Sequence, residues 1–338
     1  MTNSLKDIIK NKILEDGPMT VGQFMGLALG HPEYGYYMKA DPLGRGGDFT
    51  TAPEVSQLFG EMIGVWVADV WIQMGRPKEF ILLECGPGRG TLMADMLRAT
   101  KKVEGFHGAL RVHLLEMSPA LKEKQAETLS AYNPQWHEVL SDVPEGCPVI
   151  VIGNEFLDAL PFQQFVKVDE GEVERMIALD GDEFIFVPAE GEIFEASVER
   201  DKFVRDVCRR LKNQGGAALF VDYGHMKSAA GDTFQAVKSH EYVDVLSDIG
   251  MADLTSHVDF EALGKAGDTV VCGPVTQGAF LSALGIEMRA AMLKQKASEQ
   301  QAETIEKGLH RLIVSDQMGT LFKVIGFTDG RSVNPAGF

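Results

Sequence analysis

Three glycines at alternate positions, with a carboxylate just before them, mark the stretch of this sequence best able to bind a ligand. Gly86, Gly88 and Gly90 follow an apolar run that ends at Glu84, and apolar spacing predicts a helix over 92–99. Glycine lets a ligand approach the backbone where a side chain would block it, and the start of a helix offers free N–H groups. The pattern predicts a nucleotide-type cofactor site. The alternative is an ordinary tight turn without a ligand.

The spacing of the glycines separates two classes of cofactor. A dinucleotide fingerprint, G-x-G-x-x-G, would place its third glycine at position 91, but that residue is Thr91 and the third glycine is Gly90. The form E-x-G-x-G-x-G resembles motif I of class I S-adenosylmethionine (SAM) methyltransferases. In that motif the turn wraps the amino-acid end of SAM and the acid serves its ammonium. The resemblance implies that Glu84 and the three glycines bind SAM.

Two further acids follow expected strands in the order that a nucleoside site needs. Glu116 closes the strand expected over 110–115, where an acid holds the ribose hydroxyl pair in NAD and SAM proteins alike. Asp142, followed by Val143, comes just after the strand expected over 136–140. It is placed to accept from the adenine amino group. Each acid alone is as consistent with a helix cap or a solvated residue, but in this order the set favours SAM.

Polar residues also follow the next expected strand, 148–153. These are Asn154, Glu155 and Asp158. Open α/β sheets bind ligands beyond the carboxyl ends of their strands, so we expect these side chains at the reactive end of the cofactor and treat them as candidate catalytic residues. The alternative is a strand end capped by Asn154 with two solvated acids.

A glycine-rich segment, 43–54, precedes the cofactor strand. Its candidate ligand-contacting residues are Asp48, Thr50, Thr51 and Glu54. Glycines give mobility and these side chains give contacts, so we expect a lid over cofactor or substrate. The alternative is a flexible connection that leads into a core helix.

The elements needed to position these residues are those of an α/β fold. Apolar strands alternating with helices predict a Rossmann-like, mostly parallel sheet of seven strands. We expect the last three strands over 217–221, 269–272 and 320–327, and helices over 5–15, 21–29, 54–74, 92–99, 120–130, 198–212 and parts of 277–314. Alternating residues over 165–168, 173–179 and 184–187 predict an antiparallel insertion. We divide the chain into an N-terminal helical cap with the lid loop (1–78) and a SAM-binding domain (79–338) with a β insertion at about 162–196.

Composition limits the partners. The chain has 338 residues, 45% of them apolar, and a formal charge of −17, which argues against nucleic acid. It would suit a cationic substrate, although many proteins are simply acidic. The four cysteines form no C-x-x-C pair and the eight histidines no ligand pattern, so no metal is expected. No apolar run has the length of a membrane span, and the first residues lack a signal or transit pattern. We expect a bacterial cytoplasmic protein without membrane insertion.

Several longer motifs occur in order along the chain: GHPEYGYY, GDFTTAPEVSQLFGE, ECGPGRGTLM, LEMSPALK, NEFLDALPF, VDYGH, DLTSHVDF and MGTLFKV. Over about residues 17–324 they resemble the MidA family of SAM-dependent methyltransferases. One small departure is Cys85, where leucine is common in the family. That family includes a mitochondrial complex I assembly factor that methylates an arginine on a core complex I subunit.

The resemblance implies a protein-arginine methyltransferase whose partner is a protein substrate such as a core complex I subunit. Carboxylates are the natural holders of a guanidinium, so Glu155 is the first candidate for that role and Asp158 the second. Because SAM carries its own reactive sulfonium, no metal is needed. The alternative function is a SAM-binding assembly or scaffold factor with little or no methyl transfer. A NAD-linked dehydrogenase is a third reading, disfavoured by Thr91.

Overall fold

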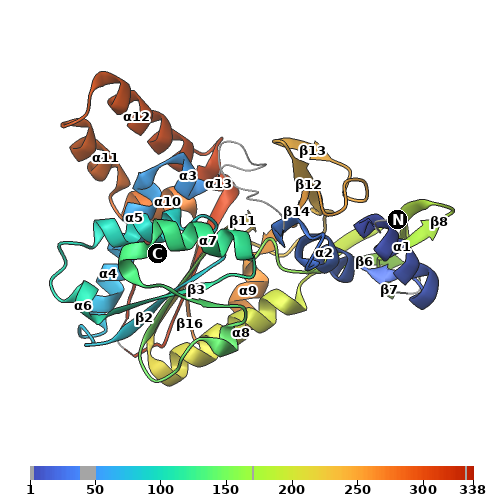
Figure 1. Cartoon of the computed structure of the whole chain (residues 1–338), viewed down its shortest axis with the longest axis horizontal. Helices are drawn as coiled ribbons and strands as arrows, with labels where there is room; N and C mark the ends of the chain where they lie inside the picture. Colours follow the sequence, from blue (N-terminus) through green and yellow to red (C-terminus); the bar gives the residue numbers. More distant parts are fainter. Residues whose placement is uncertain (1–3, 39–50, 170, 332) are drawn as a thin grey trace.

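The computed structural model of the protein describes residues 4–38, 51–169, 171–331 and 333–338 (Figure 1). In this part of the chain, one large sheet has the strand order β16-β17-β11-β5-β2-β3-β4, and β15 (Val258–Asp259) pairs with the end of β11. Strands β11, β5, β2, β3 and β4 are parallel, and β17 is antiparallel to both of its neighbours. The strands are β2 (Phe80–Cys85), β3 (Leu110–Leu115), β4 (Gln135–His137), β5 (Val149–Asn154), β11 (Gly216–His225), β16 (Val270–Thr276) and β17 (Phe322–Thr328). The mostly parallel α/β fold expected from the sequence is confirmed.

Strand β2 lies at the point where the order of the strands reverses. The chain leaves β2 for β3 on one side and returns later to β5 on the other. Cys85, the last residue of β2, is level with Leu115 of β3 and Gly153 of β5. The residues that follow these three strands therefore meet at one edge of the sheet. A crevice at such a reversal is the usual ligand site of an open α/β sheet.

Helices cover both faces of the sheet (Figure 1). Phe80 and Leu82 of β2 belong to one hydrophobic core and Ile81 and Leu83 to the other, which explains the unbroken apolar run of this strand. The first core includes α4 (Gln57–Gln73), α5 (Thr91–Ala99), α10 (Gln277–Ala283), α11 (Ile286–Lys294) and α12 (Glu299–Ile313), and the second includes α8 (Val198–Gln214) and α9 (Phe260–Ala266). The remaining helices near the sheet are α3 (Ala52–Val55), α6 (Phe106–Ala109), α7 (Pro119–Thr128) and α13 (Met318–Leu321).

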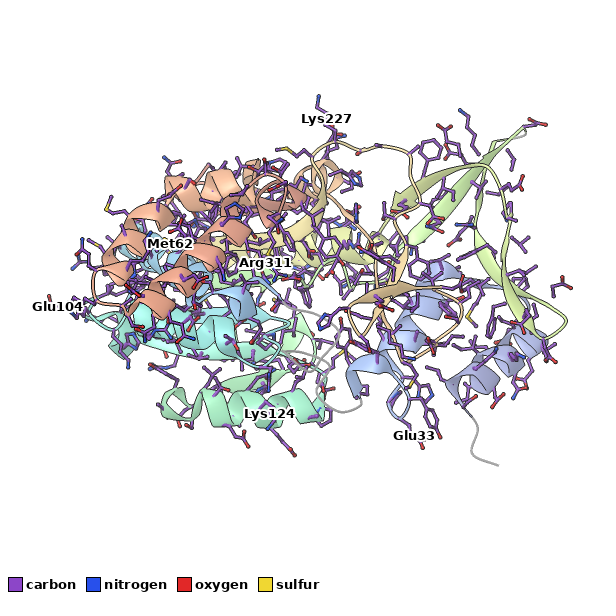
Figure 2. The ribbon with its side chains drawn as sticks, turned by 90° about the horizontal axis from the view of Figure 1, so that it is seen from above. Glu33, Met62, Glu104, Lys124, Lys227 and Arg311 are labelled. Carbon is purple, nitrogen blue, oxygen red and sulfur yellow. The ribbon has the colours of Figure 1, made fainter. Side chains whose placement is uncertain are left out.

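A second lobe lies beside the sheet in both views (Figures 1 and 2). Its core joins the N-terminal helices to the β insertion and to the segment before β15: Phe24, Phe162, Ile177 and Leu254 are all buried in it. The lobe contains α1 (Leu5–Asp16), α2 (Val21–Gly30), β1 (Met19–Thr20), β6 (Gln163–Val168), β7 (Gly171–Glu174), β8 (Met176–Asp180), β9 (Glu183–Val187), β10 (Glu192–Ala196), β12 (Gln235–Lys238), β13 (Glu241–Val243) and β14 (Asp253–Thr255). The division of the chain at residue 78 stays a prediction. In the packing, α1 and α2 share a core with the insertion, whereas α4 packs on the large sheet.

Two expected elements are interrupted. The helix expected over 54–74 is broken at Ser56, whose backbone is extended (φ −160°, ψ 135°) and whose hydroxyl caps α4 by accepting from the backbone N–H of Leu58. The strand expected over 173–179 is broken at Arg175, so that β7 and β8 join different small sheets. The buried Arg175 guanidinium donates to Gln164 and to Asp232. Neither break has a Gly or Pro in the sequence to signal it.

Candidate active site

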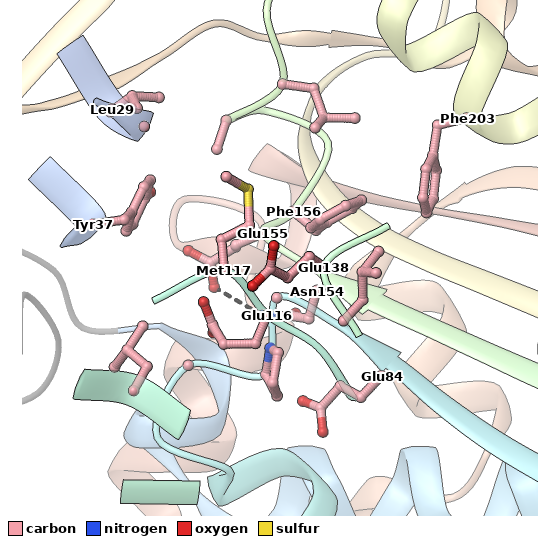
Figure 3. A pocket seen from close by; sticks show the side chains of 18 of the residues that line it. Leu29, Tyr37, Glu84, Glu116, Met117, Glu138, Asn154, Glu155, Phe156 and Phe203 are labelled. Atoms are coloured by element: carbon pink, nitrogen blue, oxygen red, sulfur yellow. Dashed lines mark hydrogen bonds between the residues drawn. The ribbon is translucent and has the colours of Figure 1, made fainter. Parts of the chain in front are cut away.

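A cavity of about 730 Å³ lies at the carboxyl edge of the large sheet, between the sheet and the second lobe (Figure 3). Leu29 and Tyr37 of the second lobe form one side and Phe203 of α8 lies at the other. Eight of the residues singled out in the sequence line this cavity: Thr51, Glu54, Glu84, Gly86, Gly88, Glu116, Asn154 and Glu155. Residues from four sequence-distant segments are thus brought to one space. Asp48 and Thr50 lie outside the described residues.

The glycine turn between β2 and α5 needs its glycines. Gly86, Gly88 and Gly90 have φ values of 63°, 54° and 81°, in the left-handed region that favours glycine. A side chain at Gly86 would also put its Cβ 3.0 Å from the Phe156 ring. Gly90 caps α5 and packs against α7, where an added Cβ would lie 3.6 Å from Cα of Gln125. At Gly86 and Gly88 the turn therefore presents backbone to the cavity.

Glu84 has a buried carboxylate oxygen that a cationic ligand group could pair with. Its side chain lines the cavity, only 2% of the residue is exposed, and Oε2 has no hydrogen-bond partner among the described residues. Burial raises the pKa of Glu84 well above its ordinary value, the nearby Glu116 carboxyl adds to this, and the backbone N–H of Met93 opposes it. A buried carboxylate without a partner is costly. The ammonium of SAM would supply that partner, so the residues present fit this cofactor.

Glu116 is suited to hold a diol. Oε1 accepts from the backbone N–H of Ser118 (2.8 Å) and Oε2 from the Gln125 amide (3.0 Å). Burial raises the pKa of Glu116, and these two hydrogen bonds counteract the rise. Each carboxylate oxygen keeps a further acceptor position. The side chains of Met117 and Val139 border the cavity beside it and are 55% and 52% exposed, which leaves apolar surface for a flat base.

Glu155 follows β5 directly and lines the cavity beside Asn154 (Figure 3). Its backbone has φ 49°, a strained conformation for a residue with a side chain. Oε1 accepts from the backbone N–H of Ala52 (3.2 Å) and from the Asn154 amide (3.1 Å). Burial, and then the neighbouring Asp158 carboxyl, raise the pKa of Glu155 to about 7, against the effect of both hydrogen bonds. Among the described residues, both hydrogen bonds end on Oε1, so Oε2 can meet a ligand.

The short helix α3 contacts two parts of the site, the loop after β5 and the start of α5. Its first backbone N–H, at Ala52, donates to Glu155, and Glu54 accepts a hydrogen bond of 2.6 Å from the hydroxyl of Thr91 at the start of α5. Thr51, at the N-cap of α3, also lines the cavity. This helix therefore touches both the glycine-turn side and the β5 side.

The other candidates lie outside the lining of the cavity. Asp158 belongs to the loop that follows β5 and is 4% exposed; burial raises its pKa, against the effects of the Tyr223 hydroxyl and of the Arg200 charge. Asp142 is exposed at the end of a 3₁₀ turn, whereas Ser141 beside it lines the cavity. Val143 is buried in the core, and its carbonyl accepts from Arg210. A role for these residues in catalysis or cofactor binding stays a prediction.

Two buried residues that the sequence analysis did not single out fix the loop after β5. Oδ2 of Asp222 accepts from the backbone N–H groups of Phe156, Leu157 and Asp158 at 3.0–3.2 Å. From the other side, Arg200 donates to the carbonyls of Leu157 (2.7 Å) and Asp158 (3.0 Å). Asp222 was visible as the acid that ends the fifth strand, but Arg200 is one of many charged residues on its helix and has no distinguishing signal.

Over residues 4–38, 51–169, 171–331 and 333–338, no group of three or more His, Cys, Asp or Glu side chains has the arrangement of a metal site. Within the same ranges, none of the helices combines the length and the apolar character needed to cross a bilayer.

Comparison with known proteins gives one family. The model of a family described as putative S-adenosyl-L-methionine-dependent methyltransferase matches residues 62–275. The protein arginine methyltransferase NDUFAF7, mitochondrial, of Danio rerio is 35% identical over 94% of this chain and 86% of its own. The Homo sapiens protein of the same name is 35% identical over 92% and 80%.

A solved structure is also similar over nearly the whole chain. It is a likely methyl transferase from Burkholderia thailandensis bound to S-adenosyl-homocysteine (SAH), with a TM-score of 0.85 and 28% identity over 98% of this chain and 93% of that one. A native crystal structure of a protein from the same organism has a TM-score of 0.83 and 29% identity to this chain. A protein with this fold therefore binds the demethylated product of SAM.

Proposed function

The chain belongs to the MidA-like family of SAM-dependent methyltransferases, and on that premise we propose that it transfers the methyl group of SAM to an arginine side chain of a protein. The names of its curated relatives support the arginine. The observation that supports the proposal is that Glu155 lines the cavity while its Oε1 is held by Ala52 and Asn154, so that Oε2 is the oxygen we assign to the substrate.

The charge of the cavity suits a cationic acceptor. Its carboxylates outnumber its cations: Glu54, Glu84, Glu116, Glu138, Glu155, Glu199 and Asp206 line it, together with Arg89 and Lys202. An acidic cavity attracts a guanidinium and disfavours an anionic substrate.

Glu155 would hold and orient the guanidinium. A guanidinium keeps its proton at neutral pH and is a poor nucleophile until it is held and polarised. Oε2 of Glu155 can accept a hydrogen bond from one of its N–H groups, and the hydrogen bonds to Oε1 prevent the carboxylate from turning away. A fixed carboxylate also fixes the attacking nitrogen in line with the methyl group. Asn154 thus acts on Glu155, and Asp158 adds negative charge behind it.

Bound SAM supplies an activated methyl group. When the N–C bond forms and the S–C bond breaks, the acceptor gains a methyl group and must release one proton. We assign the uptake of that proton to Glu155, since the pKa of about 7 lets this carboxyl exist in either form near neutral pH. We assign lid or substrate contacts to Thr51 and Glu54, which border the same space.

We propose a protein substrate such as a core subunit of respiratory complex I, and a location in the bacterial cytoplasm. The relatives named as arginine methyltransferases support a protein substrate, and the solved relatives from a bacterium support the location. The test is mass spectrometry of complex I core subunits from wild-type and deletion strains. We expect a methylated arginine that disappears with the gene. A SAM-binding assembly factor without transfer would leave the subunits unmethylated in both strains.

A further inference from the structure

The side chain of Gln125 connects the glycine turn to the carboxylate that faces the cofactor ribose. Gln125 lies on α7 and is fully buried. Its Nε2 donates to the carbonyl of Gly88 at 2.7 Å and to Oε2 of Glu116 at 3.0 Å. Its Oε1 accepts from the indole N–H of Trp136 at 2.8 Å. Gln125 itself is absent from the residues that line the cavity.

The chemistry of the partners fixes the orientation of this amide. An indole N–H can only donate, so it must face the amide oxygen. The two amide hydrogens are then directed at two acceptors, the Gly88 carbonyl and the Glu116 carboxylate. A flipped amide would place a donor against the Trp136 N–H and an acceptor against both oxygens. Trp136, on β4, therefore determines which way Gln125 points.

The consequence for Glu116 is a fixed carboxylate plane. The backbone N–H of Ser118 holds Oε1 and Gln125 holds Oε2, so rotation of the carboxylate would break one bond or the other. With both oxygens held from behind, the remaining acceptor positions can meet two adjacent hydroxyls at once. Gln125 also ties Glu116 to Gly88, so the ribose position and the glycine turn are set relative to each other.

We propose that Gln125 is a positioning residue for the cofactor: it aligns the Glu116 carboxylate with the ribose diol, and Trp136 keeps it in that orientation. This inference concerns the cofactor and does not depend on which substrate is methylated. A merely structural role for Gln125 would weaken every ligand alike, whereas a positioning role affects the recognition of the ribose hydroxyls in particular.

The test is the ratio of two affinities, measured by calorimetry on cofactor-free protein. The probes are SAH and its analogue lacking the ribose 2′-hydroxyl. In the wild type we expect SAH to bind about tenfold more tightly, the scale of one hydrogen bond to a charged group. In Gln125→Leu we expect this ratio to fall toward one. The fold of each variant is checked by circular dichroism and thermal unfolding.

Two further variants keep the test decisive if Gln125→Leu does not fold. Gln125→Glu retains the shape and the acceptor for Trp136 but puts a carboxyl beside Glu116, so the ratio should fall in the same way. Trp136→Phe removes only the N–H that orients the amide, and a smaller fall is expected. Gln135→Leu is the matched control, because Gln135 is exposed and, within the described ranges, its amide donates to the nearby carbonyls of Asn133 and Pro134 alone. An unchanged ratio in the Gln125 variants, or equal affinities of the wild type for both probes, would overturn the proposal.

Discussion

We expect Glu84 to increase the affinity for the cofactor but to lower the stability of the protein without ligand. Its buried carboxyl lacks a partner at Oε2, and burial raises its pKa. We expect Glu84→Gln to unfold at an equal or higher temperature than the wild type without ligand. Because a raised carboxyl pKa costs folded-state stability as pH rises through it, the gain should be larger at higher pH.

The same variant should bind SAM more weakly by about 1.5–3 kcal/mol, the cost of a lost charged hydrogen bond. Thermal unfolding with and without SAH measures both effects in one experiment. A variant that is less stable without ligand but is stabilised by SAH as strongly as the wild type would show that Glu84 is a structural carboxyl and not a partner of the ammonium.

The pKa of Glu155 predicts two opposite pH dependences. It lies at about 7 in the folded protein against an ordinary value of 4.5. Between these two values the folded state binds the proton and the unfolded state does not, so the stability contributed by this group is present at low pH and is lost as pH rises through about 7. The unfolding free energy of the wild type minus that of Glu155→Gln should therefore decrease as pH rises over this interval.

Methyl transfer should change in the other direction. Only the ionised carboxylate attracts a guanidinium, so kcat/KM of the wild type should rise with pH through about 7. Single-turnover rates with labelled SAM over a pH series give this profile. A wild-type rate that falls over the same interval would contradict the ionised carboxylate as the form that acts.

At the scale of elements, the loop after β5 is held in place by groups that do not touch the cavity. Asp222 accepts hydrogen bonds from three backbone N–H groups of this loop. A strained backbone such as that of Glu155, with φ 49°, persists only where surrounding contacts hold it. Burial, and then the Asp158 carboxyl, raise the pKa of Asp222 well above its ordinary value. Asp222→Asn keeps one oxygen acceptor but replaces the other with an amide NH2, while Oδ1 of Asp222 also accepts from the backbone N–H of Tyr223. At least one hydrogen bond is therefore lost, worth about 1 kcal/mol. We expect kcat to fall about tenfold or more and the affinity for SAH to change much less, because Asp222 makes no hydrogen bond to Glu84 or Glu116 among the described residues.

The matched control is Asp244→Asn, an exposed carboxylate that also accepts from a backbone N–H, that of Leu246 at 2.9 Å, in a local turn that asparagine can form as well. Steady-state kinetics and SAH titration on the same preparations separate the two quantities. Parallel losses of kcat and SAH affinity in Asp222→Asn would indicate general damage instead of a misplaced loop.

Local sequence signals were sufficient to predict the bounds of some strands and helices but not of others. Strand β3 has the bounds expected from the sequence, Leu110–Leu115, because both of its faces are buried and its apolar run ends at an acid. The breaks at Ser56 and Arg175 were missed because tertiary contacts cause them. Gly308 of α12 lies against Ser56, and Arg175 turns inward to a buried glutamine. The composition around Ser56 does not report its contact with Gly308, and that around Arg175 does not report its hydrogen bond to Asp232, 57 residues away.

At the scale of the whole molecule, the site divides into a part that local sequence predicts and a part that it does not. Glu84, the glycines and Glu116 follow strands whose order places their ends together, so their proximity could be predicted. The wall contributed by the second lobe could not. Tyr37 lines the cavity while its hydroxyl donates to Asp253 of β14 at 2.8 Å, more than 200 residues away in sequence. Such a contact depends on how the segment before β15 packs against the N-terminal part of the chain.

The account rests on Glu155 as the residue that acts on the methyl acceptor. The most direct test compares four proteins: the wild type, Glu155→Gln, Asp158→Asn and the exposed control Glu192→Gln. Each is added with labelled SAM to an extract of a deletion strain, and methyl transfer to protein is measured. SAH is titrated into the same four preparations to measure its affinity. We predict label on arginine with wild type and control, a loss of about a hundredfold or more with Glu155→Gln, and a smaller loss with Asp158→Asn, which lies outside the cavity lining. SAH affinity should be equal in all four. Transfer by Glu155→Gln at the wild-type rate, or label on a residue other than arginine, would contradict the account.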